Sequence, residues 1–207
     1  MVEDDTWSQD ERTPPMIPKN PEVLNSIRGQ LLVAMPQMED KRFRQSVILM
    51  CQFDSETAMG LIINKPKPKL DLNQLCEKLK ITPAFFHGDM PIYNGGPVED
   101  TRGFVVHSQE QMLPDSLPIG DGLAMSTQLS MIREIAAGTG PKSHQIMLGY
   151  AGWDKGQLEQ EMREGSWFHL SVTSDFIFNT PSDKMWDKCF EVTGFDAATL
   201  SPNAGSA

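Results

Sequence analysis

The amino-acid sequence predicts an α+β fold, because its strand-like and helix-like segments do not alternate regularly. Two continuous apolar runs of strand length, 46–53 and 58–64, flank the polar turn 54–57 and indicate a β-hairpin. Amphipathic segments with helix caps follow at uneven intervals. A doubly wound parallel sheet would require each strand to be followed by a helix, so the pattern favours antiparallel strands with helices packed against them.

The length of 207 residues fits one domain. Residues 1–22 are polar and rich in proline, so too little apolar surface is present to offset the entropy of ordering, and we expect a flexible arm there. The domain proper is expected over residues 23–200, and residues 201–207 read as a C-terminal tail.

The expected strands combine apolar runs with turn residues at their ends. The first, 30–35, is stopped by Pro36, and the two strands of the hairpin come next. Further strands are expected at 103–108, 123–126, 144–151, 166–172 and, as a short run, 176–178.

The expected helices are delimited by capping residues. After a helical turn at 23–28, Asp71 should cap a helix over 71–80, and Gly138 should end a helix over 127–137. Asp154 is the expected cap of a helix over 157–164. The last helix should begin after Thr180, as its N-cap, and end at Gly194.

The net charge of −10 argues against binding to a duplex, because phosphate backbones are contacted by clustered lysine and arginine. One basic segment stands apart: "NKPKPKL", residues 64–70, in which Lys65, Lys67 and Lys69 alternate with prolines. We expect a stiff, extended, solvated loop here, with an anionic partner as the alternative.

The sequence predicts a cytoplasmic protein without a membrane span. No apolar run approaches the roughly 18 residues that a transmembrane helix needs, and the first residues are acidic rather than those of a secretory signal. Cys51, Cys76 and Cys189 form no C-x-x-C pair, so reduced and buried thiols are expected.

The histidines offer little chemistry. None of the four has zinc-ligand spacing, so neither a metal site nor a cofactor is expected. His107 and Ser108 are adjacent, but neighbours on a strand point to opposite faces, and no G-x-S-x-G elbow is present. We expect His107 to be a hydrogen-bonded core or rim residue, and we identify no catalytic residues.

Two glycine-rich stretches could form a site, "YNGGPVED" (93–100) and "GYAGWDKGQL" (149–158). Glycines permit a positive φ or a close approach of two backbones. We interpret the second stretch as a tight turn after a strand, with Tyr150 and Trp153 projecting from it. Packing is the simple role for these aromatic side chains, and a neutral or cationic ligand or a partner surface is the alternative.

A third stretch, "GTGPKS" (138–143), follows a helix rather than opening one, so it reads as a turn and not as a phosphate loop.

Five blocks of sequence together resemble the YqgE/AlgH family of bacterial proteins. They run in order from about residue 29 to the tail: "LLVAMPQMEDKRFRQSVILMC", "AMGLIINKP", "YNGGPVEDTRGFVVHS", "LGYAGWDKGQLEQEM" and "FIFNTPSDKMW". The resemblance implies a coiled, bifurcated, barrel-like antiparallel sheet with helices packed around it. It also brings a transcriptional-regulator label without an established activity, and no helix-turn-helix signature supports that label here.

The family's recurring blocks suggest where a binding site would lie. The candidate binding residues that they mark in this sequence are Asn64, Gly95, Gly96, His107, Ser108, Tyr150, Gly152 and Trp153.

Three hypotheses about function follow. The first is a non-enzymatic cytosolic regulatory or binding protein that acts through protein or small-ligand contacts, with the 149–153 stretch as its contact surface. The second is a direct DNA-binding regulator that uses the lysine-rich segment. The third is an enzyme that acts on a small phosphorylated or acyl substrate near His107 and Ser108. The identity of the ligand or partner, the pathway and the oligomeric state are not determined by the sequence.

Overall fold

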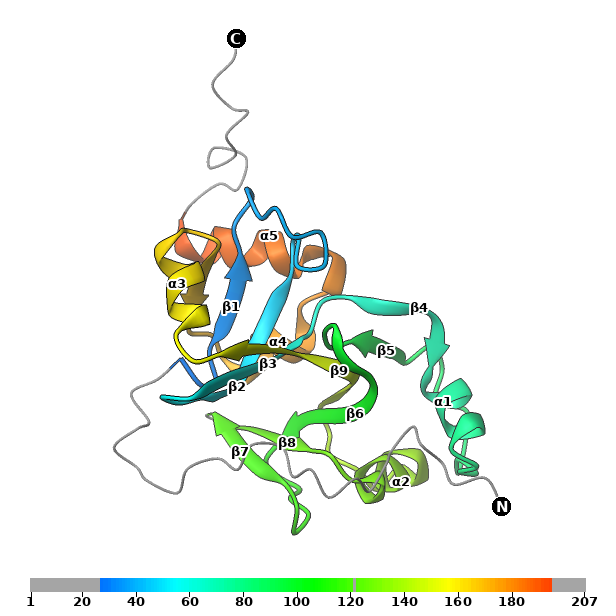
Figure 1. Ribbon diagram of the computed structural model, residues 1–207. Coiled ribbons are helices and arrows are strands. Elements are labelled where there is room, and N and C mark those ends of the chain that lie inside the picture. The colour runs from blue at the N-terminus through cyan, green and yellow to red at the C-terminus, as the bar shows by residue number, and fades with distance from the viewer. Residues whose placement is uncertain (1–26, 121, 195–207) are drawn as a thin grey trace.

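The computed structural model describes residues 27–120 and 122–194 and is built around one curled, ten-stranded sheet with helices around it (Figure 1). The strand order is β10-β1-β2-β3-β9-β6-β8-β7, and β5, which also pairs with β4, joins β9 from the side. The strands are β1 (Leu31–Ala34), β2 (Val47–Phe53), β3 (Thr57–Ile62), β4 (Pro66–Asp71), β5 (Pro91–Asn94), β6 (Val98–Ser108), β7 (Leu117–Gly120), β8 (Leu123–Ser126), β9 (His144–Asp154) and β10 (Trp167–Leu170). The helices are α1 (Leu72–Lys78), α2 (Leu129–Ala137), α3 (Gln157–Arg163), α4 (Ser174–Asn179) and α5 (Ser182–Thr193).

The sheet forks along β9. The first half of β9 lies between β6 and β5, and β5 is its parallel neighbour. The second half exchanges β5 for β3, which pairs with Ala151 to Asp154. The expected bifurcated sheet is therefore confirmed, and the β5–β9 pair is its one departure from antiparallel pairing among the described strands.

Helices cover both faces of the sheet, which explains why β1 and β2 are apolar without alternation. Alternate residues of β1 enter different cores: Leu31 and Val33 pack with α4 and α5, whereas Leu32 and Ala34 pack with Leu158 of α3. The indole of Trp186 in α5 donates a hydrogen bond to the carbonyl of Ala34 at 2.8 Å and fixes that helix to β1. A third core joins α1 and α2 to β5, β6 and the first half of β9.

Several sequence predictions are confirmed. The hairpin forms from β2 and β3, with a bulge between Met50 and Gln52. Asp71 caps α1 in a reciprocal capping box with Gln74, and Gly138 ends α2 in the left-handed conformation. The 138–143 segment joins α2 to β9, as expected of a turn.

Other predictions about elements are wrong. The 176–178 run belongs to helix α4, because the Thr173 hydroxyl accepts from the amide of Phe176 and starts a helical turn. Residues 66–70 of the lysine-rich segment belong to strand β4 rather than to a loop, since the backbones of Pro66 and Asp71 pair with β5. β5 and β7 were not expected, because each is short and contains proline, a residue that weakens a strand pattern.

The expected caps of two helices are displaced. Gly156, rather than Asp154, is the N-cap of α3, because β9 runs on as far as Asp154. Pro181, rather than Thr180, is the N-cap of α5, because Thr180 already closes α4.

The expected arm (1–22), most of the 23–28 turn and the tail (201–207) lie outside the described residues. Within the described ranges, no helix is both long enough and apolar enough to cross a membrane.

Candidate functional site

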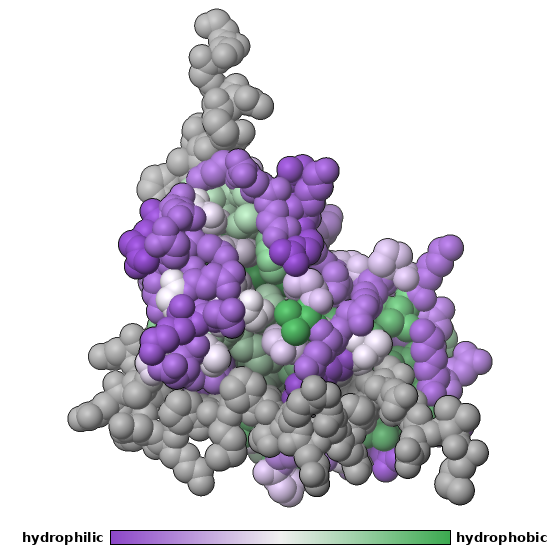
Figure 2. Space-filling view, viewed as in Figure 1, coloured by the Kyte–Doolittle hydropathy of each residue, from purple (hydrophilic) through white to green (hydrophobic). Residues whose placement is uncertain are grey.

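Two hollows open next to each other beside Pro97, and they share Pro97 and Arg42. The first, which we call the indole cleft, has a volume of about 500 Å³. It lies between α3, the end of β9 and the loop 35–46 that joins β1 to β2. In Figure 2 strongly hydrophilic residues rim this face and less polar residues lie between them.

Three aromatic side chains from separate segments meet at the indole cleft. The ring of Phe43 stacks on Trp153 at a centroid distance of 6.4 Å and meets Trp167 edge-on at 5.5 Å. The two indoles are themselves perpendicular, with centroids 6.0 Å apart. Trp153 and Trp167 are almost fully buried, so the cleft has a rigid apolar wall.

One carboxylate orients both indoles. Oε2 of Glu161 accepts from Nε1 of Trp153 at 2.9 Å and from Nε1 of Trp167 at 2.8 Å. Its Oε1 accepts from the side-chain amide of Gln157 at 2.9 Å. Since these donors are neutral, they orient the carboxylate without cancelling its charge.

The indole cleft is acidic. Glu39, Glu161 and Glu164 line it, whereas the charge of Arg42 is matched by Asp40, whose Oδ2 lies 2.7 Å from the guanidinium. The hydrogen bond from Arg42 keeps the pKa of Asp40 below its usual range. A carboxylate-lined cleft with aromatic walls has the chemistry of a site for a cationic group.

Asn64 holds the loop that forms one wall of the cleft. Its Oδ1 accepts from the amide of Val47 at 2.8 Å, and its Nδ2 donates to the carbonyl of Gln45 at 2.9 Å. Asn64 lines neither hollow and acts through this support.

The Gly-Gly pair closes the fork of the sheet. The amide of Gly95 donates to Leu148 of β9, and its carbonyl accepts from Ile62 of β3, both at 2.8 Å. A Cβ at Gly95 would lie 2.1 Å from the carbonyl oxygen of Gly149. Gly96 has a φ of 152°, and a Cβ there would lie 2.1 Å from the carbonyl carbon of Tyr150. These glycines therefore serve close backbone approach, one of the two roles expected of them.

The second hollow, which we call the lysine groove, has a volume of about 550 Å³. It is lined by Arg42, Ile62, Lys65, Pro66, Lys67, Pro68, Asn94, Gly96, Pro97 and Asp100. Lys67 of β4 and Lys65, the residue just before that strand, both line it.

Comparison with known proteins agrees with this architecture. The model of the AlgH-like family matches residues 31–198, which is most of the chain. The chain belongs to the AlgH-like family. A UPF0301 protein from Methylobacterium nodulans is 44% identical over 187 residues, covering 86% of this chain and 89% of that one.

Solved structures share the fold of this AlgH-like protein. The solution structure of AlgH from Pseudomonas aeruginosa superimposes with a TM-score of 0.72 at 36% identity and covers 93% of this chain and 100% of that one. A crystal structure from Corynebacterium diphtheriae, at 21% identity and a TM-score of 0.68, covers 84% and 91% and shows the fold alone.

The structure of the AlgH-like protein brings some of the candidate binding residues together. Gly152 and Trp153 line the indole cleft, and Gly96 lines the lysine groove. Gly95 precedes Gly96 in the chain but is not part of the lining. Trp153 does not project from a turn as expected, because β9 continues through it and pairs Trp153 with Ala58. Tyr150 is half-buried and lines neither hollow; its ring meets Phe104 edge-on at 5.9 Å.

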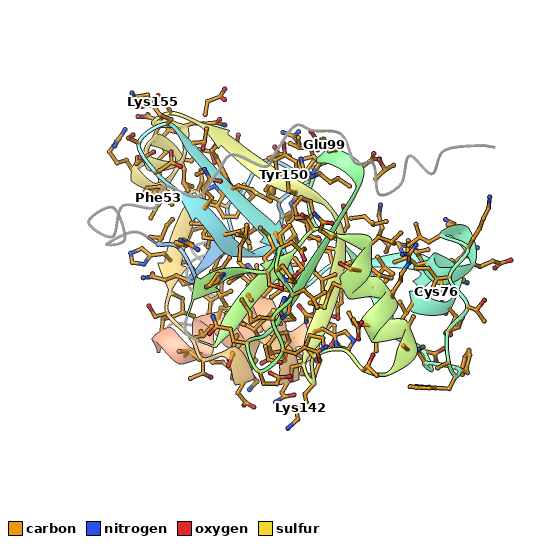
Figure 3. The ribbon with its side chains drawn as sticks, turned by 90° about the horizontal axis from the view of Figure 1, so that it is seen from below. Phe53, Cys76, Glu99, Lys142, Tyr150 and Lys155 are labelled. Atoms are coloured by element: carbon orange, nitrogen blue, oxygen red, sulfur yellow. The ribbon has the colours of Figure 1, made fainter. Side chains whose placement is uncertain are left out.

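His107 and Ser108 lie away from both hollows. They end β6, whose first residue Val98 lines the indole cleft. Val98 pairs with Tyr150 of β9 and His107 with His144, six residues apart on β9, which corresponds to about 20 Å. In Figure 3, Lys142, which precedes the start of β9, lies on the opposite side of the molecule from Tyr150. Ser108 at the end of β6 is bonded to that same region, since its hydroxyl donates to the carbonyl of Ser143.

The partner of His107 is Ser126, not its neighbour Ser108. Nε2 of the fully buried His107 lies 3.0 Å from the hydroxyl of Ser126, which in turn lies 2.7 Å from the hydroxyl of Ser116. Nδ1 lies 3.0 Å from the carbonyl of Ser108. The expected hydrogen-bonded core role of His107 is therefore confirmed.

The cysteines are buried, as expected. Burial raises the pKa of the Cys51 and Cys189 thiols to about 12, and it also raises the pKa of Cys76. Thiolate chemistry near neutral pH is therefore disfavoured at these positions.

Six residues on which the chemistry of the indole cleft depends were not candidates from the sequence: Glu39, Arg42, Phe43, Glu161, Glu164 and Trp167. The signal for Phe43 was a lone aromatic side chain between two arginines in a polar loop. Glu161 and Trp167 had no local signal, because only the packing of α3 against β9 and β10 joins them.

Proposed function

We propose that this AlgH-like protein is a cytoplasmic, non-enzymatic regulatory or binding protein that recognises a positively charged group in the indole cleft. The observation that carries the proposal is the meeting of Phe43, Trp153 and Trp167 with the carboxylates that line the same cleft. The charged group would belong to a small molecule or to a side chain of a protein partner.

The chemistry of the cleft favours an ammonium that carries alkyl groups. Cation–π contact with an aromatic face contributes about 0.5–2 kcal/mol, more when the cation is desolvated. The molecule already contains one such contact, since the Arg42 guanidinium lies 5.5 Å from the centroid of Phe43. Glu39 and Glu164 are exposed at the rim, where they would attract a cation without a large desolvation cost.

A binding role is supported over a catalytic one by the arrangement of the polar groups. The buried His107, Ser126 and Ser116 are bonded to one another, away from the cleft. The carboxylate of Glu161, at the cleft itself, is held by three neutral donors that orient it as a fixed charge.

The test is an NMR titration with tetramethylammonium chloride, referenced to sodium chloride at equal ionic strength. The indole N–H resonances of Trp153 and Trp167 should shift saturably with tetramethylammonium alone. Neutralising the rim in the double variant Glu39→Gln and Glu164→Gln should weaken binding about two- to fivefold for each carboxylate. The matched control is Glu77→Gln, an exposed carboxylate on α1 outside the cleft. Identical responses to the two salts would refute the proposal.

Direct DNA binding is the alternative, and it has weaker support. Of the three lysines that it requires, Lys65 and Lys67 face the lysine groove at half-buried positions, and Lys69 is exposed and lies outside the lining. The basic surface is therefore a confined groove, whereas a duplex backbone requires a row of accessible cations.

A further inference from the structure

The lysine groove holds two ammonium groups in defined positions. Lys65 Nζ donates to the carbonyl of Arg42 at 3.0 Å, and Lys67 Nζ donates to the carbonyl of Asp100 at 3.3 Å. Within the described ranges, neither lysine forms an ion pair. An ammonium carries three donors, so each retains donors beyond these bonds for a further acceptor.

The backbone is restricted at the start of β4, next to these lysines. Pro66 and Pro68 alternate with them and restrict φ, and Pro66 pairs with Tyr93 of β5. Lys65 directly precedes β4 and Lys67 is its second residue, and both side chains line the groove. The two long side chains are therefore already ordered in the free protein, so ligand binding loses less side-chain entropy.

The charges of the groove are only partly compensated. Three cations, Arg42, Lys65 and Lys67, line the groove with one carboxylate, Asp100. Asp40 forms an ion pair with Arg42 and also attracts Lys65, so the groove keeps a positive excess. Partial burial lowers the pKa of Lys65, which indicates an ammonium that has lost some of its hydration. A bound anion would replace that hydration.

We propose that the lysine groove is a second binding site, which takes the phosphate group of a small molecule. Lys65 and Lys67 supply charged donors, and Asn94, Gly96 and Pro97 complete the lining beside them. The site is independent of the cation site proposed for the indole cleft. The two lysines are not simply solvated side chains, because each ammonium donates a hydrogen bond to a backbone carbonyl of another segment.

The probe is inorganic pyrophosphate, measured by calorimetry and by NMR against sodium sulfate at equal ionic strength. Saturable binding should shift the backbone amides of Asn94 and Gly96. Lys67→Gln should weaken this binding about fivefold or more, whereas Lys69→Gln should leave it within twofold, since Lys69 lies on the same strand outside the groove. Lys65→Gln provides a second variant and should weaken this binding in the same way as Lys67→Gln.

Three outcomes would overturn the site: no saturable binding of pyrophosphate, equal losses in the Lys67 and Lys69 variants, or displacement of pyrophosphate by a mixed-sequence duplex. The second would indicate diffuse electrostatics, and the third a nucleic-acid surface. Repeating the titration in the Glu39→Gln, Glu164→Gln variant separates this site from the indole cleft, because its affinity for pyrophosphate should be retained there.

Discussion

At the scale of single residues, Glu161 is the side chain on which the indole cleft depends most. It accepts from two indoles and one amide, and these donors come from β9, β10 and its own helix. A buried donor that loses its acceptor costs its full desolvation energy, so one substitution affects three elements.

Replacing Glu161 should therefore destabilise the protein according to what the new side chain can accept. Glu161→Ala leaves two indole N–H groups unpaired and should lower the free energy of unfolding by about 2–4 kcal/mol. Glu161→Gln keeps a carbonyl acceptor and should cost less than about 1.5 kcal/mol. Urea unfolding measures both, with the exposed Glu164→Ala as the control. Equal stability of Glu161→Ala and Glu164→Ala would contradict this role.

His144 should make the protein sensitive to mild acid. Burial, together with the neighbouring His87 and His107, lowers its pKa below 6.5 and outweighs the bond to the Pro141 carbonyl at 2.9 Å. Because that carbonyl accepts, the proton lies on Nδ1, and Nε2 is buried with no partner among the described residues.

The direction in which stability changes with pH follows from which state binds the proton. Below pH 6.5 the unfolded state binds a proton at this histidine that the folded state resists, so stability falls as the pH falls, by up to about 1.4 kcal/mol per pH unit. Urea unfolding at pH 7.5, 6 and 5 should show this slope, and His144→Gln should reduce it. An unchanged slope in the variant would assign the effect to other groups, such as carboxylates with lowered pKa values, for example Asp40.

At the scale of elements, the fork of β9 is what places the two hollows side by side. β9 exchanges β5 for β3 near Gly149, and the Gly-Gly segment crosses the backbone of β9 at that point. Pro97 then stands between the indole cleft and the lysine groove. The close approach of two backbones therefore determines where both sites lie.

A methyl group at the contact between the Gly-Gly segment and β9 should push the two backbones apart. Gly95→Ala would set a Cβ 2.1 Å from a backbone carbonyl, and we expect a loss of about 3 kcal/mol or more. Gly152→Ala is the matched control on β9, because its nearest neighbour is the ring of Tyr150 at 3.3 Å, which can move. Thermal unfolding of the two variants measures this difference. Similar melting temperatures would contradict the prediction, because they would show that the two backbones can move apart at little cost.

At the scale of the whole molecule, charge is distributed unevenly. The chain carries a net charge of −10, and its acidic indole cleft adjoins a groove with two confined lysines. Opposite charges on adjacent hollows favour small ligands of defined charge over a long polyanion, which would meet the carboxylates as well.

Binding to duplex DNA should accordingly be weak. Fluorescence anisotropy with a labelled mixed-sequence duplex should give no dissociation constant tighter than about 100 μM at near-physiological salt. Binding that persists at that salt and weakens in the Lys65, Lys67 and Lys69 glutamine variants would instead support a direct regulator. No binding at low salt would direct the search to protein or small-molecule partners.

Local patterns in the sequence were sufficient for many elements. Apolar runs predicted the β2–β3 hairpin, and Asp71 and Gly138 predicted helix ends, because these signals act within a few residues. The 176–178 run was assigned to the wrong class, since three apolar residues have no distinct period and a threonine cap decided their conformation.

The α+β class, the glycine positions that allow close backbone contact and, through five blocks of residues, the family could all be predicted from the amino-acid sequence. Which of those residues form a site became clear only from the folded chain. Phe43, Trp153, Glu161 and Trp167 come from four segments, and no periodicity relates them. His107 and Trp153 both carried a functional prediction, yet they lie in different parts of the sheet. Helix caps, turns and hydrophobic periodicity depend on residues a few positions apart, whereas a cleft depends on contacts between segments that are distant in the chain and meet only when the forked sheet curls.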